Sequence, residues 1–270
     1  MNRRPTLSGL QLKLLALLTM TMDHVGAVLV RGSLYRPLRD IGRLAFPIYC
    51  FLLVEGYLHT RDVKKYLGRL LFAFLLSELP FDAALYRSVP APRRNVMLTL
   101  VLGLVTVLVL DRVRGALWEH RPFLGREALC WKQGPPPLWL ELPLCLAVIS
   151  AGMGAAFWLQ TDYRGGGVLL IVLFFVFRER KEALLLTVPP LLLVFYTPME
   201  LWGTLALLPI ALYDPQKGRP ARRADSPQTK SRRSRALQWF FYLYYPVHLT
   251  VLALLRDLLL HTPVTLELPF

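Results

Sequence analysis

The sequence predicts an all-α protein, a polytopic bundle of transmembrane helices with eight to ten spans and a cytoplasmic N-terminus. Of its 270 residues, 54% are hydrophobic and only 19% are charged, which argues against a water-soluble globule. The apolar residues lie in long runs, and a helix needs about 20 such residues to cross a bilayer. These runs are continuous and do not alternate with a period of two, which excludes the strands of a membrane β-barrel.

The apolar runs follow one another along the whole chain, so we expect one integral membrane domain over residues 1–270. The first run is too long for a signal peptide and lacks a small-residue cleavage site. The seventh and eighth runs are so close together that they form either a tight hairpin or one broken re-entrant element. With nine as the working count, the candidate spans are 10–30, 41–58, 66–86, 95–110, 139–160, 167–177, 183–196, 200–213 and 238–260.

The basic residues orient this arrangement. With the N-terminus inside, 21 of the 32 Lys and Arg residues fall in inner segments, 7 in outer segments and the rest within spans, as the positive-inside rule requires. The net charge of +14 therefore reflects topology. We expect the bilayer as a partner and no nucleic acid, because a nucleic-acid binder gathers its basic residues on a soluble face. Residues 214–237, rich in Pro, Ser, Lys and Arg, predict a basic, disordered cytoplasmic loop near lipid headgroups.

Ionisable residues inside the predicted spans indicate a functional interior. Asp23 and His24 lie in the first span and Arg43 in the second, all near the predicted outer face. Adjacent helical residues point about 100° apart, so we expect Asp23 to pair with Arg43 while His24 faces a cavity. The other interpretation, an ion pair and a histidine that only fix helix packing, stays open. His248 lies in the last span, where Pro246 is expected to kink the helix.

Other polar residues lie at both predicted ends of the bundle. Asn95 opens the fourth span, and Asp162 and Tyr163 form an outer turn before three glycines. At the inner end, Glu55 and His59 are four residues apart and share a helical face.

The sequence offers no motif for the common enzyme classes and no set of metal ligands. The Glu55 and His59 pair lacks a third ligand, so we expect no metal. The three cysteines have no ligand spacing and predict no disulfide framework. P-loop, GxGxxG, GxSxG and HExxH motifs are missing from the sequence.

Seven sequence motifs, which follow one another along the chain in the same order as in the family, together resemble the TraX family. They are LKLLA (12–16), MDHVG (22–26), RDIGRLAFPI (39–48), LVEGYLHT (53–60), YLGRL (66–70), NVMLTL (95–100) and YLYYPVHL (242–249). Asp162 and Tyr163, with the segment GVL (167–169), also match the family pattern. The resemblance therefore covers most of the chain, and its most specific motifs lie in the first hundred residues.

The resemblance implies an acyltransferase of the bacterial cytoplasmic (inner) membrane. The family is named for a conjugal-transfer protein that N-acetylates the amino terminus of pilin, and it is similar to other transmembrane acyltransferases that use acyl-CoA. Acetyl-CoA is the implied donor, and an amine or hydroxyl of an exported protein or glycan is the implied acceptor. The long basic loop and Arg164 before the three glycines depart from the family pattern, so pilin itself is not carried over as the acceptor.

Residue chemistry and resemblance together suggest a mechanism. His24 or His248 acts as general base, because a histidine titrates near neutral pH. Arg43, held by Asp23, or Asn95 stabilises the oxyanion. The residues expected to bind substrate or cofactor are Glu55, His59, Arg69, Asn95, Asp162 and Tyr163.

Two other function classes remain open at this point. In a proton-coupled or anion transporter, the same ionisable residues would line a pathway through the membrane. In a non-catalytic assembly factor for a pilus or surface polymer, single substitutions at Asp23 and His24 would be tolerated.

Overall fold

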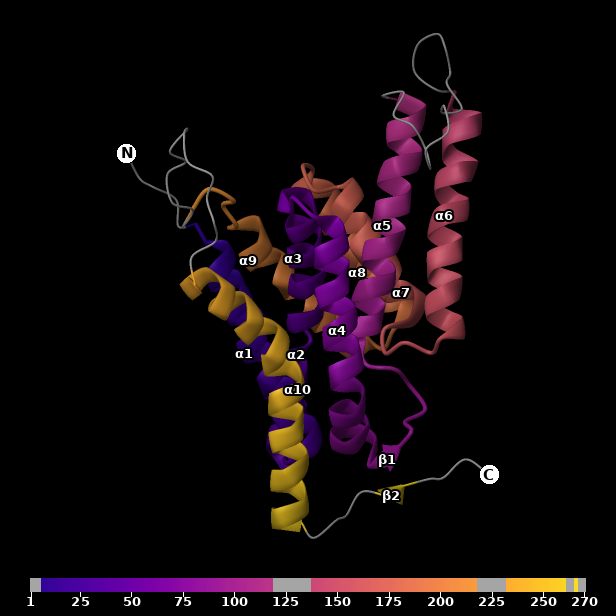
Figure 1. Ribbon diagram of the computed structural model, residues 1–270. Coiled ribbons are helices and arrows are strands. Elements are labelled where there is room, and N and C mark those ends of the chain that lie inside the picture. The colour runs from indigo at the N-terminus through magenta and orange to yellow at the C-terminus, as the bar shows by residue number, and fades with distance from the viewer. Residues whose placement is uncertain (1–5, 119–136, 218–231, 261–264, 267–270) are drawn as a thin grey trace.

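The computed structural model describes residues 6–118, 137–217, 232–260 and 265–266. These residues form a bundle of α-helices with three shorter helical turns and one pair of two-residue strands (Figure 1). In chain order the elements are α1 (Gly9–Val28), η1 (Gly32–Leu34), α2 (Tyr35–Gly42), α3 (Ala45–His59), α4 (Val63–Phe81), η2 (Asp82–Tyr86), β1 (Ser88–Val89), α5 (Val96–Trp118), α6 (Leu138–Trp158), α7 (Arg164–Val176), α8 (Lys181–Phe195), η3 (Pro198–Ala206), α9 (Leu207–Ala211), α10 (Arg232–Leu260) and β2 (Thr265–Leu266). The all-α prediction is confirmed.

At each end of the bundle, backbone hydrogen bonds join segments that are distant in the sequence. At one end, Leu7 N donates to Leu212 O, which joins the start of α1 to the end of α9. At the other end, Arg94 N donates to Gln160 O, and β1 pairs in parallel with β2. The segment before α1 is therefore joined to the end of α9, and β2, which follows α10 in the chain, is joined to β1 (Figure 1).

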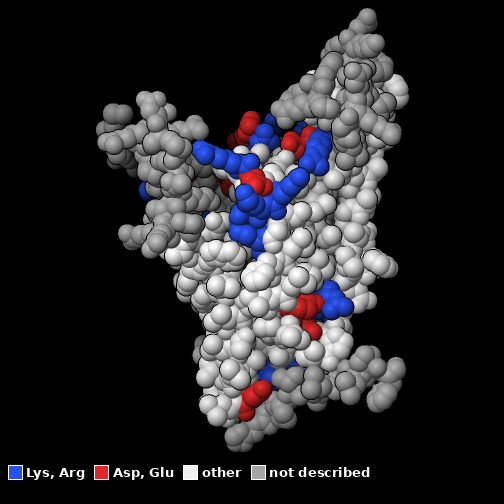
Figure 2. Space-filling view, in the orientation of Figure 1, with Lys and Arg blue, Asp and Glu red and all other residues white. Residues whose placement is uncertain are grey.

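Within the described residues, three helical stretches are long and apolar enough to cross a membrane. They are Gly32–His59, Val96–Trp118 and Leu138–Trp158. Charged side chains gather at the upper end of the visible face, and a broad band below them carries few charges (Figure 2). Large apolar side chains such as Leu75, Trp158 and Leu186 are exposed, as expected for surfaces that face lipid. The prediction of eight to ten spans with the N-terminus inside stays a prediction.

Several predicted spans have different boundaries in the structure. The second is broken near Arg43 into α2 and α3, and the third ends as an α-helix at Phe81 and continues as the π-helix η2. The fourth was predicted to end at residue 110 but continues to Trp118. Hydropathy locates the apolar part of a helix, whereas the helix itself ends where its backbone hydrogen bonds end.

The two closely spaced apolar runs after residue 180 form a hairpin. The first is α8, and the second is the 3-10 helix η3 followed by α9, which packs on α8 and α3. The turn between them comes at Thr197, which is extended, and Pro198, which occupies the first turn of η3. Proline is tolerated there because the first helical N–H groups need no partner inside the helix.

The predicted disordered loop 214–237 is wrong at its end, because α10 begins at Arg232. A helix can continue past the apolar stretch, since arginine, leucine and glutamine are good helix formers. At the start of the predicted loop, Asp214 N donates to Leu7 O, so this part is joined to the bundle. Residues 218–231 lie outside the described residues.

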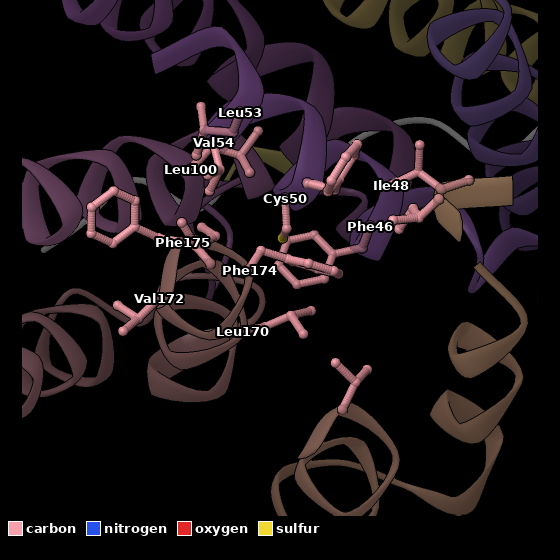
Figure 3. Close-up of a cluster of buried hydrophobic side chains, with 14 of the residues drawn as sticks. Phe46, Ile48, Cys50, Leu53, Val54, Leu100, Leu170, Val172, Phe174 and Phe175 are labelled. Carbon is pink, nitrogen blue, oxygen red and sulfur yellow. The ribbon is translucent and has the colours of Figure 1, made fainter. Parts of the chain in front are cut away.

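The main hydrophobic core lies between α3, α5, α7 and α8 (Figure 3). Phe51 and Phe174 meet edge to face there, with ring centroids 5.9 Å apart. A second cluster joins α1 to α10 through residues such as Met20, Tyr245 and Leu249. This second cluster positions the ionisable residues of the first span against those of the last.

Candidate functional site

A cavity of about 1080 Å³ lies within the bundle. Its lining comes from α1, α2, α3, η2, α5, α6, the turn before α7, the turn after α8, and α10. Pockets for drug-sized ligands usually measure roughly 300–1,000 Å³, so this cavity is large enough to hold a ligand of that size. Asp23, His24, Arg43, Asp162 and Tyr163, all predicted site residues, line it.

A cluster of four charged side chains, of which Asp23 and Arg43 are buried and Arg39 and Glu200 partly buried, forms one wall of the cavity. Asp23 accepts from Arg39 Nη1 at 2.9 Å and also from Arg43 Nη2. Arg43 Nη1 donates to Glu200 at 2.5 Å, and Arg43 Nε donates to Arg39 O at 3.2 Å. Two arginines and two carboxylates balance in charge, which is the condition for burying such groups. The predicted pairing of Asp23 with Arg43 is present in the structure.

Gly42 makes this cluster possible. A Cβ at Gly42 would collide with Asp23 Cβ and Oδ1. The missing side chain therefore lets α2 approach α1 closely enough for the Asp23 carboxylate to reach both arginines.

His24 and His248 form a hydrogen-bonded pair next to this wall, on α1 and α10. The His24 Nδ1 and His248 Nε2 atoms are 2.7 Å apart, and both residues are 8% exposed. His248 Nδ1 lies 2.8 Å from Tyr244 O. A carbonyl only accepts, so in the neutral pair His248 carries its proton on Nδ1, and its Nε2 accepts the proton of His24 Nδ1.

This chain of hydrogen bonds fixes the tautomer of His24. With its proton on Nδ1, neutral His24 carries a lone pair on Nε2, and no described residue hydrogen-bonds to that atom. His24 lines the cavity, whereas His248 is not among the lining residues. The geometry therefore favours His24 as a base and gives His248 the role of orienting it.

Asp162 and Tyr163 occupy the turn between α6 and α7 and line the cavity. Tyr163 stacks on Phe46 with ring centroids 3.5 Å apart, and Tyr196 Oη donates to Tyr163 O at 2.8 Å. A Cβ at Gly167 would meet Thr99, Tyr163 and Phe46, so this glycine admits close packing of the turn. Burial raises the pKa of Asp162 to about 6, although the positive charges of Arg43 and Arg93 oppose the shift.

Asn95 has a structural role in the described structure. Its amide nitrogen donates to Phe74 O at 3.0 Å and to Glu78 Oε2 at 2.6 Å, which uses both hydrogens. Its Oδ1 accepts from Met97 N at the start of α5. The expected oxyanion contact from Asn95 has no free donor here.

Glu55, His59 and Arg69 lie outside the cavity lining, toward the other end of the bundle. Glu55 accepts from Tyr213 Oη at 3.0 Å and lies 3.6 Å from His59 Nδ1, so this pair makes local contacts. Arg69 lies over the Tyr242 ring, 5.9 Å from its centroid. The described residues contain no cluster of three His, Cys, Asp or Glu side chains suited to a metal ion.

Among the cavity residues that sequence reasoning missed are Arg39, Glu200 and Tyr245. Arg39 precedes Arg43 by four residues and Tyr245 precedes His248 by three, so helical spacing from a chosen residue could have found both. Glu200 follows the break after α8, and no local pattern connects it with Arg43.

The family model for "TraX protein" matches residues 8–256 of this chain. The chain belongs to the TraX family. Family membership and helices able to cross a bilayer together indicate a membrane protein.

One curated relative of this TraX family member comes from Dichelobacter nodosus and is named "Probable fimbrial assembly protein FimC, serogroup H1". The two are 36% identical over 121 residues, which is 40% of this chain and 49% of the relative. The match therefore spans about half the length of that protein. No solved structure matches the chain.

Proposed function

We propose that this chain is a multi-pass acyltransferase of the bacterial inner membrane that transfers an acetyl group from acetyl-CoA to an amine or hydroxyl of an exported or cell-surface acceptor. The observation that carries the proposal is the His24 and His248 pair, which leaves His24 Nε2 unprotonated at the wall of a large cavity. Membership of the TraX family and the fimbrial name of the relative support a pilus subunit or similar exported protein as the acceptor.

The transfer needs one general base and no covalent bond between the enzyme and the acetyl group. The acceptor nitrogen or oxygen attacks the thioester carbonyl carbon, and His24 Nε2 takes the proton that the acceptor loses. The tetrahedral intermediate collapses, the carbon–sulfur bond breaks, and the CoA sulfur leaves with the proton that His24 returns. His248 accepts from His24 Nδ1 throughout and stabilises the imidazolium. The ion cluster, neutral overall, holds α1 and α2 in place beside the base.

The donor and acceptor reach the site from opposite sides in this scheme. Under the predicted topology, the part of the cavity lined by Asp162 and Tyr163 lies toward the outer side, where an exported acceptor arrives. Basic residues of the inner segments, such as Lys64 and Lys65, favour the phosphates of CoA.

The test is release of CoA from acetyl-CoA by the purified protein in liposomes, with amine and polyol acceptors and with a pilin-derived peptide. We expect His24→Ala to lower turnover by about 10²- to 10⁴-fold, the usual contribution of general base catalysis. His248→Ala lowers it less, and His248→Gln restores part of the loss because the glutamine amide oxygen can accept from His24.

Thr19→Ala is the matched control on the same helix. Thr19 Oγ1 donates only within α1, to Leu15 O and Ala16 O, and lies outside the cavity lining. This variant should turn over like the wild type. Equal turnover of His24→Ala and Thr19→Ala in folded protein would refute the assignment of His24.

A second candidate, a non-catalytic assembly factor, is favoured by the name of the fimbrial relative. It predicts that pili form normally in cells carrying His24→Ala, provided that the protein inserts in the membrane. A transporter instead predicts flux into liposomes that is independent of CoA.

A further inference from the structure

We infer that the Tyr245 hydroxyl is the donor that stabilises the oxyanion of the thioester carbonyl, an inference that rests on the proposed acyl transfer. Tyr245 lies on α10, lines the cavity and is only 2% exposed. Its Oη has no hydrogen-bond partner among the described residues. A buried hydroxyl normally has a partner, so an unpartnered one at a cavity wall indicates a ligand group that bonds to it when bound.

Tyr245 lies next to both histidines. Its ring centroid is 5.9 Å from that of His24 and 5.6 Å from that of His248. His24 and Tyr245 line the same cavity, so a carbonyl group bound beside His24 has Tyr245 as a neighbour. Base and oxyanion donor must flank the same carbon, which is the arrangement that acyl transfer needs.

The other predicted donors are held by protein groups. Arg43 donates from each of its three nitrogens, to Arg39 O, Asp23 and Glu200, and these bonds fix the guanidinium within the ion cluster. Both amide hydrogens of Asn95 are used by Phe74 O and Glu78. Moving either residue to a substrate would break buried hydrogen bonds, whereas Tyr245 gives up none.

Arg39 Nε is also buried without a partner and belongs to a lining residue. Its guanidinium is fastened to Asp23, on the wall formed by α2. Tyr245 is the better candidate because its ring lies beside the base itself.

The hydroxyl acts by donating one hydrogen bond. As the acceptor attacks, the carbonyl oxygen gains negative charge and accepts from Tyr245 Oη, which keeps its proton. When the carbon–sulfur bond breaks, the carbonyl forms again and the hydrogen bond weakens. The hydroxyl therefore contributes more in the transition state than in the bound substrate.

The experiment compares Tyr245→Phe with wild type in the CoA release assay, with thermal unfolding measured on the same samples. We expect kcat to fall by about 10²- to 10³-fold, as for loss of one oxyanion donor, with KM for acetyl-CoA nearly unchanged. The unfolding temperature stays the same or rises, because the variant removes a buried hydroxyl that has no partner. A structural role would instead lower the unfolding temperature and spare kcat.

Tyr57→Phe is the matched control. The Tyr57 hydroxyl donates to Asp111 at 2.6 Å, away from the cavity lining. This variant should unfold at a lower temperature and keep its kcat, the opposite of Tyr245→Phe.

The outcomes separate this inference from the function on which it rests. If wild type turns over and Tyr245→Phe matches it in kcat, the oxyanion assignment is wrong and acyl transfer stands. If folded wild type releases no CoA with any acceptor, both fall.

Discussion

Single residues in this protein acquire their roles from the partners that the fold gives them. His24 and His248 are similar in sequence context, each a histidine within an apolar run, but only one of them lines the cavity. The carbonyl of Tyr244 fixes the proton on His248, and His248 in turn fixes the proton on His24. The choice of base is therefore made by two hydrogen bonds and not by the residue type.

Asp162 carries the clearest pH dependence outside the spans. Its pKa, ordinarily 3.8, is raised to about 6 by burial, so the folded protein holds this proton more tightly than the unfolded chain does. Burial of the carboxylate thus destabilises the fold above about pH 6, and stability is regained as the pH falls from about 6 toward 4. We expect Asp162→Asn to be more stable than wild type at pH 7 and equally stable near pH 4.

The measurement is the unfolding temperature of both proteins in detergent over this pH range. The other titrating groups are common to both, so the difference between the two curves reports Asp162. A difference that does not change between pH 7 and pH 4 would contradict the raised pKa.

At the scale of elements, the cavity wall depends on how closely neighbouring helices approach each other. The contact of α1 with α2 is the clearest case. Asp23 reaches two arginines of the second apolar run because Gly42 leaves room for its side chain. Hydropathy predicted one helix over 41–58, while the structure has two helices that meet near Arg43. The break turns α2 so that Arg39 and Arg43 both face Asp23.

We expect Gly42→Ala to destabilise the protein by about 1–3 kcal/mol, the usual cost of overpacking, and to lower CoA release. Gly68→Ala is the matched control, since Gly68 is an exposed residue within α4 with no atom within 4 Å of an added Cβ. It should leave stability unchanged or raise it by up to about 1 kcal/mol. Thermal unfolding of both variants provides the comparison, and equal unfolding temperatures would show that close approach at Gly42 is not needed.

At the scale of the whole molecule, the cavity depends on segments from most of the chain. The second half of α1, the turn after α8 and the last helix all contribute walls, and no contiguous part of the sequence contains the site. The orientation in the membrane decides which substrate meets which end of this cavity.

Membrane-impermeant thiol labelling tests that orientation. Ser33 and Arg61 are exposed. Ser33 is the second residue of the stretch Gly32–His59, which is long and apolar enough to cross a membrane, and Arg61 follows the end of that stretch. In a cysteine-free background, we expect Ser33→Cys to react in intact cells and Arg61→Cys to react only after permeabilisation. The reverse pattern would place the N-terminus outside and invert the predicted directions of donor and acceptor.

The sequence by itself determined the helical class, the membrane environment, the family resemblance and the candidates Asp23, His24, Arg43 and His248. These depend on local composition, periodicity and motifs, which are visible along the chain. Only the tertiary structure decided which candidates meet. It joined His24 to His248 across 224 residues and Arg43 to Glu200 across 157. It also assigned Asn95 to a helix start and placed Glu55, His59 and Arg69 outside the cavity lining. The physical reason is that such contacts depend on how close the helices approach and which way their side chains face, and side-chain packing across the bundle fixes both.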